Sequence, residues 1–304
     1  MTEKTTGIDV FVMVLNEEAN IRLCLESVKW ADRIFILDSR STDRTLDIAR
    51  EYTDSIYTRD FDNFSAQINW GLDNMPFGND LLLFVDADEL VTPELAEEVR
   101  AVAAANPPGV DAWWVKRRFI FLGRWLKYGG QYKTRVIRLF RHANVRFQRL
   151  VNQVPVYKGA DALLEHDMIH EDRKGFSALV ARHNSYSTYE AMETVKRRYP
   201  ELLTDREREE TLRDDQAVKK KKRLFERLPL VVRPPLRFVY MYVFALGFLD
   251  GAAGFIYSFF KMCYEFFICV KIYEIKVERR ARRPDTPPRA EGAGGSSVLS
   301  DKET

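Results

Sequence analysis

Cysteine and histidine are scarce in this chain of 304 residues, which has three cysteines and four histidines. Cys24, Cys263 and Cys269 have no paired spacing and lie in apolar surroundings. This pattern argues against a disulfide framework and a zinc site, and it fits a reducing cytosolic setting. The N-terminus lacks a basic segment followed by a long apolar region and a cleavage site, so we expect no signal peptide.

Neither sign of charge dominates, because the formal net charge is only +2. With 46% hydrophobic residues the chain can bury a full core, which excludes a disordered protein. The basic residues are unevenly spread, with one block at 219–223 and another at 279–283. No internal repeat is visible, and the sequence suits one large domain or one domain with an appendage.

The most informative segment is LLLFVDADE at residues 81–89, an apolar run that stops at Asp86 and Asp88. A strand buried on both faces carries its first charges at its C-terminal end, which is where open α/β sheets bind ligands. Carboxylates without neighbouring Cys or His suit Mg²⁺ or Mn²⁺ held together with substrate phosphates. The segment therefore predicts a metal-dependent site for a nucleoside diphosphate. The alternative is that both aspartates only cap a turn and the following helix.

Strand-like and helix-like segments alternate through the first hundred residues. Strand patterns cover residues 9–15, 33–37, 55–58 and 81–85, and helical patterns follow them. Strict alternation implies parallel pairing with right-handed crossovers, so we expect an α/β fold with a mostly parallel sheet and helices on both faces. From Ala112 onward aromatic and basic strands and loops follow, and their large aromatic side chains are expected to be mainly core.

The C-terminal half contains a charged stretch and then an apolar one. Residues 238–260 are long enough to cross a bilayer but contain Asp250 and several glycines, and basic residues flank both sides. A hairpin or a pair of interfacial helices entering one leaflet fits both observations. Buried helices of a soluble core are the alternative. We expect four regions: 1–200 a nucleotide-binding domain, 201–235 a charged linker, 236–280 membrane-associated helices and 281–304 a disordered tail.

Several motifs together resemble the family 2 inverting glycosyltransferases, which have the GT-A Rossmann-like fold. They are VMVLNEEANI, WADRIFILDSRSTDRT and FVDADE, joined by FLGRW, RLFR, HEDRK, RHNSYS and GFLDGAAGF in the C-terminal half. The second set resembles the membrane-associated branch that contains lipopolysaccharide core β-glucosyltransferases. The likeness spans about residues 9–275, and the motifs are more specific jointly than singly.

The resemblance implies roles for particular residues. Asp88 would coordinate the Mn²⁺ or Mg²⁺ ion, and Asp86 would contact the ribose, the donor sugar or the same metal. The remaining positions implied for the nucleotide or substrate are Leu15, Asn16, Glu17, Asp38, Gln67, Asn69 and Arg138. Asp38 can accept a hydrogen bond from a uracil N–H. Each acid could instead cap a turn or helix, and we favour that interpretation for Asp43.

Inversion by direct displacement needs a base, normally a carboxylate. Where the branch has His-Glu after a Val, this chain has Val151, Asn152 and Gln153, and an amide cannot act as a base. Glu171 is the first substitute and Asp172 the second. Glu165 and Asp167 lie behind them in the sequence, and His170 could orient a carboxylate or accept the proton itself. The alternative is that HEDRK only caps the following helix.

The sequence thus predicts a glycosyltransferase that moves a hexose or N-acetylhexosamine from a UDP-sugar to a lipid-linked saccharide. The acceptor would belong to lipopolysaccharide core, O-unit or exopolysaccharide assembly. We expect it on the cytoplasmic face of the bacterial inner membrane, monotopic or peripheral, with the basic block on an anionic membrane surface rather than on nucleic acid. Two alternatives stay open: transfer to polyprenyl phosphate, and a non-catalytic scaffold that binds sugar nucleotides. Donor sugar, linkage and oligomeric state are not readable.

Overall fold

The structure, a computed structural model, describes residues 7–148, 153–203 and 225–281. A mixed sheet forms the centre of the molecule, with the strand order β3-β2-β1-β4-β8-β6-β12-β5, while β7 and β11 also pair with β6. Strands β9 and β10 form a separate antiparallel pair. The strands are β1 (Ile8–Val14), β2 (Arg33–Asp38), β3 (Ile56–Thr58), β4 (Leu81–Asp86), β5 (Glu89–Leu90), β6 (Val110–Phe121), β7 (Arg124–Trp125), β8 (Arg135–Arg141), β9 (Arg146–Gln148), β10 (Val154–Val156), β11 (Ala160–Leu163) and β12 (Met168–His170).

The first four strands are parallel, as the alternating pattern predicts. β1 lies between β2 and β4, with Val10 opposite both Ile34 and Leu83. Five of the six apolar residues of β1 are completely or almost completely buried and Met13 is half-buried, because helices cover both faces of the sheet. The predicted α/β class with a mostly parallel centre is confirmed.

Beyond β4 the sheet becomes mixed, because β8 runs antiparallel to both β4 and β6. β6 therefore runs in the same direction as β4, and β12 is parallel to β6. As a result the carboxyl ends of β1, β2, β4, β6 and β12 share one edge of the sheet, which we call the carboxyl edge. In open α/β sheets this edge is where ligands bind.

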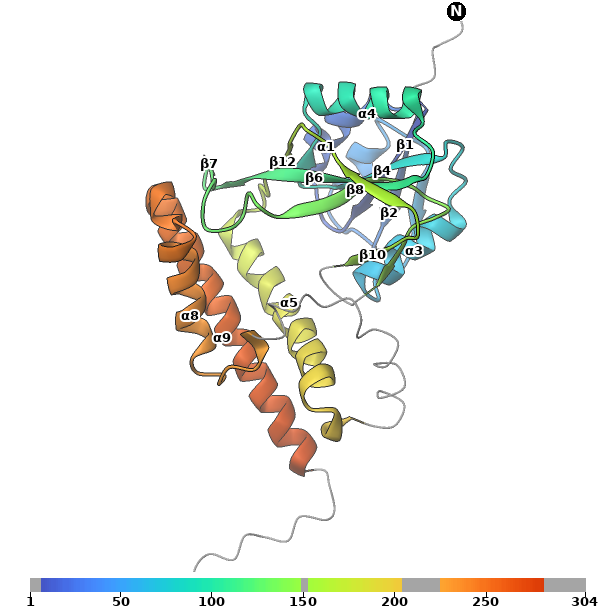
Figure 1. The fold of residues 1–304 in the computed structure, drawn as a ribbon. Helices are drawn as coiled ribbons and strands as arrows, with labels where there is room; N and C mark the ends of the chain where they lie inside the picture. Colours follow the sequence, from blue (N-terminus) through green and yellow to red (C-terminus); the bar gives the residue numbers. More distant parts are fainter. Residues whose placement is uncertain (1–6, 149–152, 204–224, 282–304) are drawn as a thin grey trace, which may run out of the picture.

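Two layers of helices bury the sheet (Figure 1). Helices α1 (Ile21–Val28), α2 (Thr45–Ala49) and α4 (Pro93–Ala105) contribute to one apolar cluster, and α3 (Phe64–Asn74) contributes to the cluster on the other face. Local sequence sets these helix starts. The Thr92 hydroxyl accepts a hydrogen bond from the Leu95 N–H at 3.2 Å, and Pro93 follows it at the first helical position.

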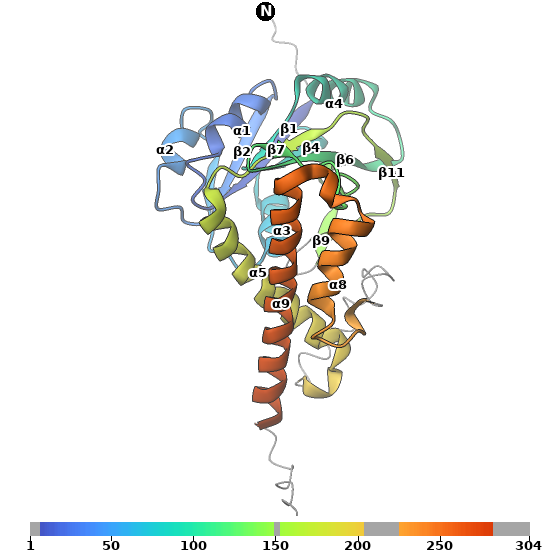
Figure 2. The same ribbon diagram turned by 90° about the vertical axis from the view of Figure 1, so that its left-hand side faces the viewer.

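The C-terminal helices lie beside this domain. α5 (Gly175–Arg198) is followed by the short 3₁₀ helix Pro200–Leu202, and then by α8 (Arg233–Val239). A π-helical turn Tyr240–Phe244 and a 3₁₀ turn Gly247–Asp250 lead into α9 (Gly251–Ala281). α9 packs along α5 on one side and α8 on the other (Figures 1 and 2). The chain therefore reverses within the apolar segment 238–260, as the hairpin interpretation requires.

Close backbone contact shapes the apex of this hairpin, residues 245–251. A Cβ on Gly254 would lie 2.1 Å from the Gly247 carbonyl oxygen, so only glycine permits the apex to rest on α9. The Asp250 carboxylate accepts hydrogen bonds from the Lys127 and Tyr128 N–H groups at 3.2 and 2.9 Å. Since Lys127 and Tyr128 follow β7, the apex is fastened to the carboxyl edge.

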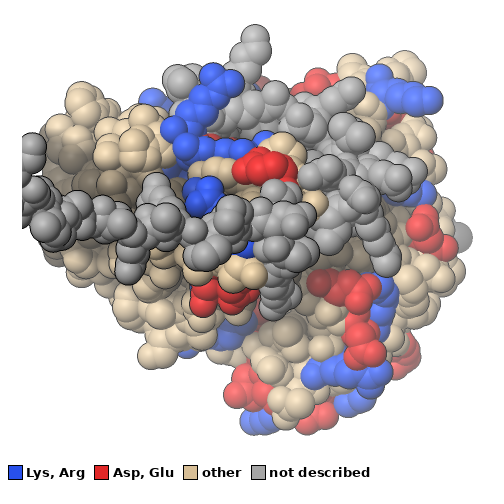
Figure 3. All heavy atoms as spheres, turned by 90° about the horizontal axis from the view of Figure 1, so that it is seen from below, with Lys and Arg blue, Asp and Glu red and all other residues tan. Residues whose placement is uncertain are grey.

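The hairpin helices expose an apolar face. Among the described residues one helical stretch, Gly247–Ala281, is long and apolar enough to cross a membrane, and 39% of its most apolar window is buried. Apolar side chains exposed on α9 recur at helical spacing: Phe255, Ile256, Phe259, Phe266, Val270, Tyr273 and Val277. The side chains of Leu236 and Val239 in α8 are also exposed, as are those of Val243 and Phe244 after it. Figure 3 views the molecule from below; the surface at its left that grey atoms leave uncovered, on the side where Figure 1 shows these helices, is mostly uncharged.

Some expectations fall outside the described residues, namely those for the lysine block at 219–223, for Val151 and Asn152 and for the tail after residue 281. The three cysteines lie within the described part and are all free, which agrees with the absence of a disulfide framework. Trp113 is buried in the core, as expected, with 3% of its surface exposed.

Candidate functional site at the carboxyl edge

The acidic segment after β4 is held by two arginines, the buried Arg138 and the half-buried Arg117. The Arg138 guanidinium of β8 contacts both Asp86 and Glu89, with an N···O distance of 2.7 Å to Glu89. Arg117 of β6 contacts the same Glu89 at 3.1 Å. Burial raises the pKa of Glu89, but Arg138 and Arg117 outweigh this effect and hold it below its ordinary value. Arg138 therefore bridges Asp86 and Glu89 and fixes the conformation of the acidic segment.

Asp88 belongs to a second cluster, which includes His170 and Arg182. Its carboxylate lies 3.3 Å from the His170 ring nitrogen Nε2 and 3.5 Å from the Arg182 guanidinium. Although burial favours the neutral acid, these two neighbours hold the pKa of Asp88 well below its usual range. Asp88 is consequently held as a carboxylate, and 11% of its side chain is exposed.

Strand pairing places the HEDRK segment beside Asp88. His170, the last residue of β12, pairs with Glu89 on one side and with Phe119 of β6 on the other. The Glu171 N–H then donates to the Asp88 carbonyl oxygen at 2.9 Å. The two residues proposed as bases are therefore brought next to the acidic segment, although more than 80 positions separate them from it in the chain.

Asp172 and Glu171 differ in their contacts. Asp172 accepts hydrogen bonds from the Asn20 side chain at 3.1 Å and from the Lys174 N–H at 3.0 Å, and pairs with Arg182 at 2.9 Å. The Glu171 side chain pairs with Arg173, two residues further along the chain, and 27% of it is exposed. Asp172 is thus committed to protein contacts, whereas Glu171 is more accessible.

Asn20, Lys174 and Arg182 complete this network and were not singled out by the sequence analysis. The Asn20 amide, which is 3% exposed, links Glu17 to Asp172 and accepts the Arg173 N–H. Lys174 pairs with Glu17 at 2.6 Å. Burial raises the pKa of Glu17 despite this lysine. The motifs NEEANI and RHNSYS contain Asn20 and Arg182, so the signal was present, but nothing in the spacing showed that the two would meet.

The loops after β1 and β2 form the neighbouring part of the edge. The Asn16 side chain accepts the Thr42 N–H at 2.8 Å, and its own N–H donates to the Ser41 hydroxyl. Asp38 is 1% exposed and accepts the N–H groups of Arg40 and Ser41 at 3.0 Å each. Asp43 accepts from Thr45 and Glu18, which is the turn role expected for it.

The remaining predicted positions are more scattered. Leu15, the first residue after β1, is exposed, with 45% of its surface accessible. Gln67 is buried and donates to the Ser39 hydroxyl, so it lies beside Asp38. Asn69 exchanges two hydrogen bonds with the backbone of Phe147 and thereby fastens α3 to β9. Its side chain serves that strand rather than an open pocket.

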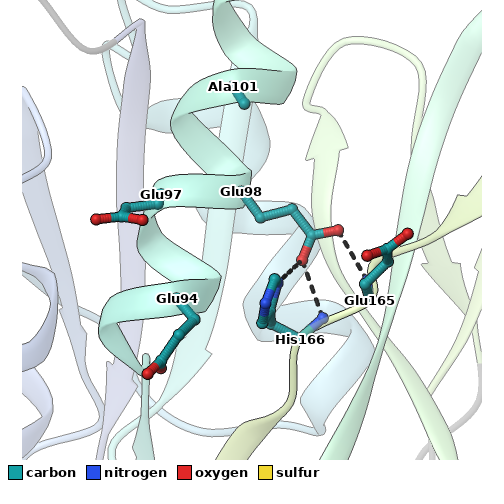
Figure 4. Close-up of a pocket in the computed structure, with 6 residues that line it drawn as sticks. All are labelled: Glu94, Glu97, Glu98, Ala101, Glu165 and His166. Atoms are coloured by element: carbon teal, nitrogen blue, oxygen red, sulfur yellow. Dashed lines mark hydrogen bonds and ion pairs between the residues drawn. The ribbon is translucent and has the colours of Figure 1, made fainter.

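The acids that precede HEDRK lie elsewhere. Asp167 is buried and binds Arg118 and the Tyr132 hydroxyl. Glu165 and His166 donate their N–H groups to Glu98 of α4 and line a shallow acidic surface pocket, shown in Figure 4. No residue of the Asp88 cluster lines this pocket, so neither Glu165 nor Asp167 is placed to act there.

The Asp88 cluster fits a hard divalent cation bound together with phosphates. Asp88 offers a carboxylate and His170 a ring nitrogen. Among the described residues no group of three or more His, Cys, Asp or Glu that could hold a metal ion is found. Mg²⁺ is usually held by one or two carboxylates together with substrate phosphates, so a single carboxylate such as that of Asp88 suits it. Around it, Arg182 and Lys174 add positive charge suited to a departing diphosphate.

Comparisons with known proteins identify the family of this chain. The family model "Glycosyl transferase family 2" matches residues 9–163. An uncharacterized glycosyltransferase of Rickettsia typhi is 27% identical over 201 residues, covering 62% of this chain and 68% of the relative. The lipopolysaccharide core biosynthesis glycosyltransferase LpsC of Rhizobium meliloti is 24% identical over 275 residues, covering 88% of this chain and 92% of the relative.

Among solved structures, glucosyl-3-phosphoglycerate synthase from Mycobacterium tuberculosis, in complex with Mn²⁺ and UDP-glucose, is similar at 21% identity with a TM-score of 0.31. That match covers 38% of this chain and 44% of the synthase. The family model alone covers half of the chain and includes β2, which ends at Asp38, and the strands that precede Asn16 and Asp88. The chain therefore belongs to glycosyl transferase family 2, and it is a glycosyltransferase.

Proposed function

We propose that this glycosyltransferase transfers a hexose or N-acetylhexosamine from a UDP-sugar to a lipid-linked saccharide, with inversion and with a divalent metal. The observation that carries the proposal is the carboxyl edge itself. It presents the ionised Asp88 among cations, and the apex of the apolar hairpin is fastened to the same edge through Asp250. Donor chemistry and a membrane-bound acceptor can therefore meet at one place.

For the donor, we assign the metal to Asp88, with His170 as a neighbouring ligand and Asp86 oriented by Arg138 toward the ribose or donor sugar. When bound, Mn²⁺ or Mg²⁺ would neutralise the negative charge that develops on the departing phosphates. Asn16, Glu17, Asp38 and Leu15 would surround the nucleoside, and Gln67 would support Asp38 through Ser39. Arg182 would add a second positive charge near the departing group.

For the acceptor, we assign the base to Glu171. A base must be accessible to the acceptor hydroxyl whose proton it takes, and Glu171 is the less committed of the two carboxylates in HEDRK. Its backbone is fixed to that of Asp88, so its position relative to the donor site is set by the sheet. Asp172, in contrast, orients Asn20 and Arg182.

For the location, we propose the cytoplasmic face of the bacterial inner membrane. The exposed apolar face of α8 and α9 would enter one leaflet, and nearby basic side chains would contact anionic headgroups. A relative aligned over 92% of its length is named for the biosynthesis of the lipopolysaccharide core. A lipopolysaccharide is a saccharide carried on a lipid. This supports a lipid-linked saccharide as the acceptor.

Turnover of UDP-sugars with Mn²⁺ and total membrane lipid, followed by mass spectrometry of the product, tests the proposal. We expect Asp88→Ala to lower turnover by at least about 100-fold, because its loss removes the charge that a metal would need. Asp54→Ala is the matched control, since Asp54 is an exposed acid away from the edge. Equal turnover in both variants would refute the metal assignment. A product on polyprenyl phosphate would redirect the acceptor assignment.

A further inference from the structure

The turn between β6 and β7 contains Leu122, whose backbone conformation is unfavourable for leucine. Phe121 pairs with Arg124, so the hairpin turns through Leu122 and Gly123. Both have positive φ, 50° and 72°, as in a type I′ turn. Asn-Gly is the preferred pair there, whereas leucine in a left-handed conformation is strained. Leu122 is nevertheless 62% exposed, so packing within the chain does not account for it either.

The sequence around Leu122 is basic and apolar. No acidic residue occurs between Phe119 and Arg135, and Arg124 and Lys127 are exposed. The hairpin apex lies alongside, because the Gly129 N–H donates to the Ala245 carbonyl at 2.9 Å in addition to the two bonds of Asp250.

The apex resembles this turn. Leu246 has a positive φ of 61° and is 44% exposed, and Phe248 and Leu249 beside it are each 46% exposed. Two turns from separate parts of the chain thus present strained or exposed apolar tips, and the apex is bonded to residues 127–129, which follow the β6–β7 hairpin. Backbone strain persists only where the surrounding structure imposes it, and strained residues cluster at functional sites. The strain at Leu122 and Leu246 therefore points to a functional contact made by both tips.

We propose that Leu122 inserts into the surface of an anionic bilayer, as a membrane contact made by the catalytic domain itself beside the α8–α9 apex. This inference rests on the proposed membrane location. The exposed apolar residues of the apex continue from α8 and α9 to the β6–β7 turn, and Arg124 and Lys127 complement anionic headgroups. A membrane therefore matches both the apolar tip and its basic margin.

The contact would set the height of the catalytic edge above the lipid. Phe119, three residues before Leu122, lies on the His170 ring with centroids 5.3 Å apart, and His170 contacts Asp88. Phe119 also packs on Tyr257 of α9 at 5.0 Å. β6 thus connects the turn, the hairpin and the acidic site as one packed unit, so a fixed depth for Leu122 fixes the distance from acceptor headgroups to Asp88.

The test is co-sedimentation of the full chain with vesicles of phosphatidylethanolamine and phosphatidylglycerol, compared with neutral phosphatidylcholine vesicles. The variant is Leu122→Asn, which creates the preferred Asn-Gly pair and so improves the turn while removing the apolar tip. We expect at least about a tenfold weaker affinity for the anionic vesicles, together with an unchanged or higher Tm. Leu163→Asn is the matched control, because Leu163 is an exposed leucine on β11.

Equal vesicle affinity for Leu122→Asn and Leu163→Asn would overturn the inference, and so would a wild-type chain that does not bind these vesicles. A wild-type dimer that Leu122→Asn dissociates without changing vesicle affinity would also overturn it, because the tip would then contact a second copy. Turnover of UDP-sugar is measured separately. Failure of the proposed reaction with normal Leu122-dependent binding would therefore leave the membrane contact supported.

Discussion

Arg182 joins the acidic site to helix α5. Its guanidinium lies 3.5 Å from Asp88 and 2.9 Å from Asp172, and burial does not prevent these carboxylates from raising its pKa. An arginine that stands between a proposed metal ligand and a second acid keeps two negative charges close together without repulsion. If it also neutralises the departing diphosphate, its loss should affect turnover more than folding.

Arg182→Ala tests this role. We expect a loss of about 1–3 kcal/mol in the free energy of unfolding, since a partly buried ion pair is broken, and at least a tenfold loss of turnover. Arg182→Lys should recover part of the turnover, because it keeps the charge but loses the planar fork. Arg22→Ala, which removes an exposed pair with Glu51, is the control. Similar effects of both alanine variants on turnover would argue against the role.

His183 provides a prediction about pH. Burial, with help from Lys261, lowers the pKa of His183 to about 3, although the Leu179 carbonyl opposes this. Its ring packs against Phe260 and Tyr264 of α9. The neutral ring is therefore required in the folded state, whereas the unfolded chain takes up a proton near pH 6.5. This stability is fully present above pH 6.5 and is lost as the pH falls toward 3.

At pH 5 the loss from His183 should be about 2 kcal/mol relative to pH 7.5. Urea unfolding of the wild type and of His183→Phe at both pH values measures it, because phenylalanine keeps an aromatic ring but cannot titrate. Acids elsewhere contribute equally to both proteins and cancel in the difference. If the two proteins lose the same free energy between pH 7.5 and pH 5, His183 does not carry this dependence.

At the scale of elements, the sequence predicted the parallel half of the sheet best. Strands β1, β2 and β4 are mostly apolar, β3 is short, and helical patterns follow each of the four, so local periodicity was sufficient. The insertion of β8 between β4 and β6 was not predictable in the same way, because it depends on antiparallel pairing over long separations. Local patterns do not specify which distant strand becomes a neighbour.

The site shows the same limit. Asp86 and Asp88 were identified because they end a buried strand, and HEDRK was identified by resemblance. Asn20 and Asp172, however, meet across 152 positions. Asn69 illustrates the opposite case, because a residue chosen for the donor pocket instead bonds the backbone of Phe147. Polar residues serve both catalysis and loop fastening, and only their contacts distinguish the two.

The Asp250 contact is an element-scale hypothesis. Asp250→Ala removes both acceptors for the Lys127 and Tyr128 N–H groups and should cost about 1–3 kcal/mol. We expect faster amide exchange at these two residues and lower turnover on lipid acceptor, with unchanged binding of UDP. Asp47→Ala, an exposed acid on α2, is the control. Protected amides at Lys127 and Tyr128 in the variant would show that the apex is held by other contacts.

At the scale of the whole molecule, two functions are divided between two surfaces. The carboxyl edge carries the polar chemistry, and the outer face of α8 and α9 carries exposed apolar side chains. α5 lies between them: Arg182 contacts the site, and the adjacent His183 contacts α9. Because the two surfaces share no residue, the chemistry and the location of the enzyme should be separable by mutation.

The double variant Phe259→Asp and Phe266→Asp tests this separation. Both side chains are exposed, 47% and 55%, so their replacement should change Tm little. Two charges on the apolar face should prevent its entry into a leaflet, because each ionised group would have to leave water. We therefore expect soluble protein without detergent, normal binding of UDP with Mn²⁺, and at least a tenfold loss of turnover on lipid acceptor.

Leu23→Asp with Val156→Asp is the matched control, since these residues are exposed on α1 and β10, away from the hairpin. It adds the same charge without touching α8 or α9, so it should leave turnover on lipid nearly unchanged. Equal losses in the two double variants would mean that added charge, rather than a lost membrane contact, is responsible. Loss of UDP binding in the α9 variant alone would mean that the hairpin supports the fold of the site, and that the two surfaces are not separable.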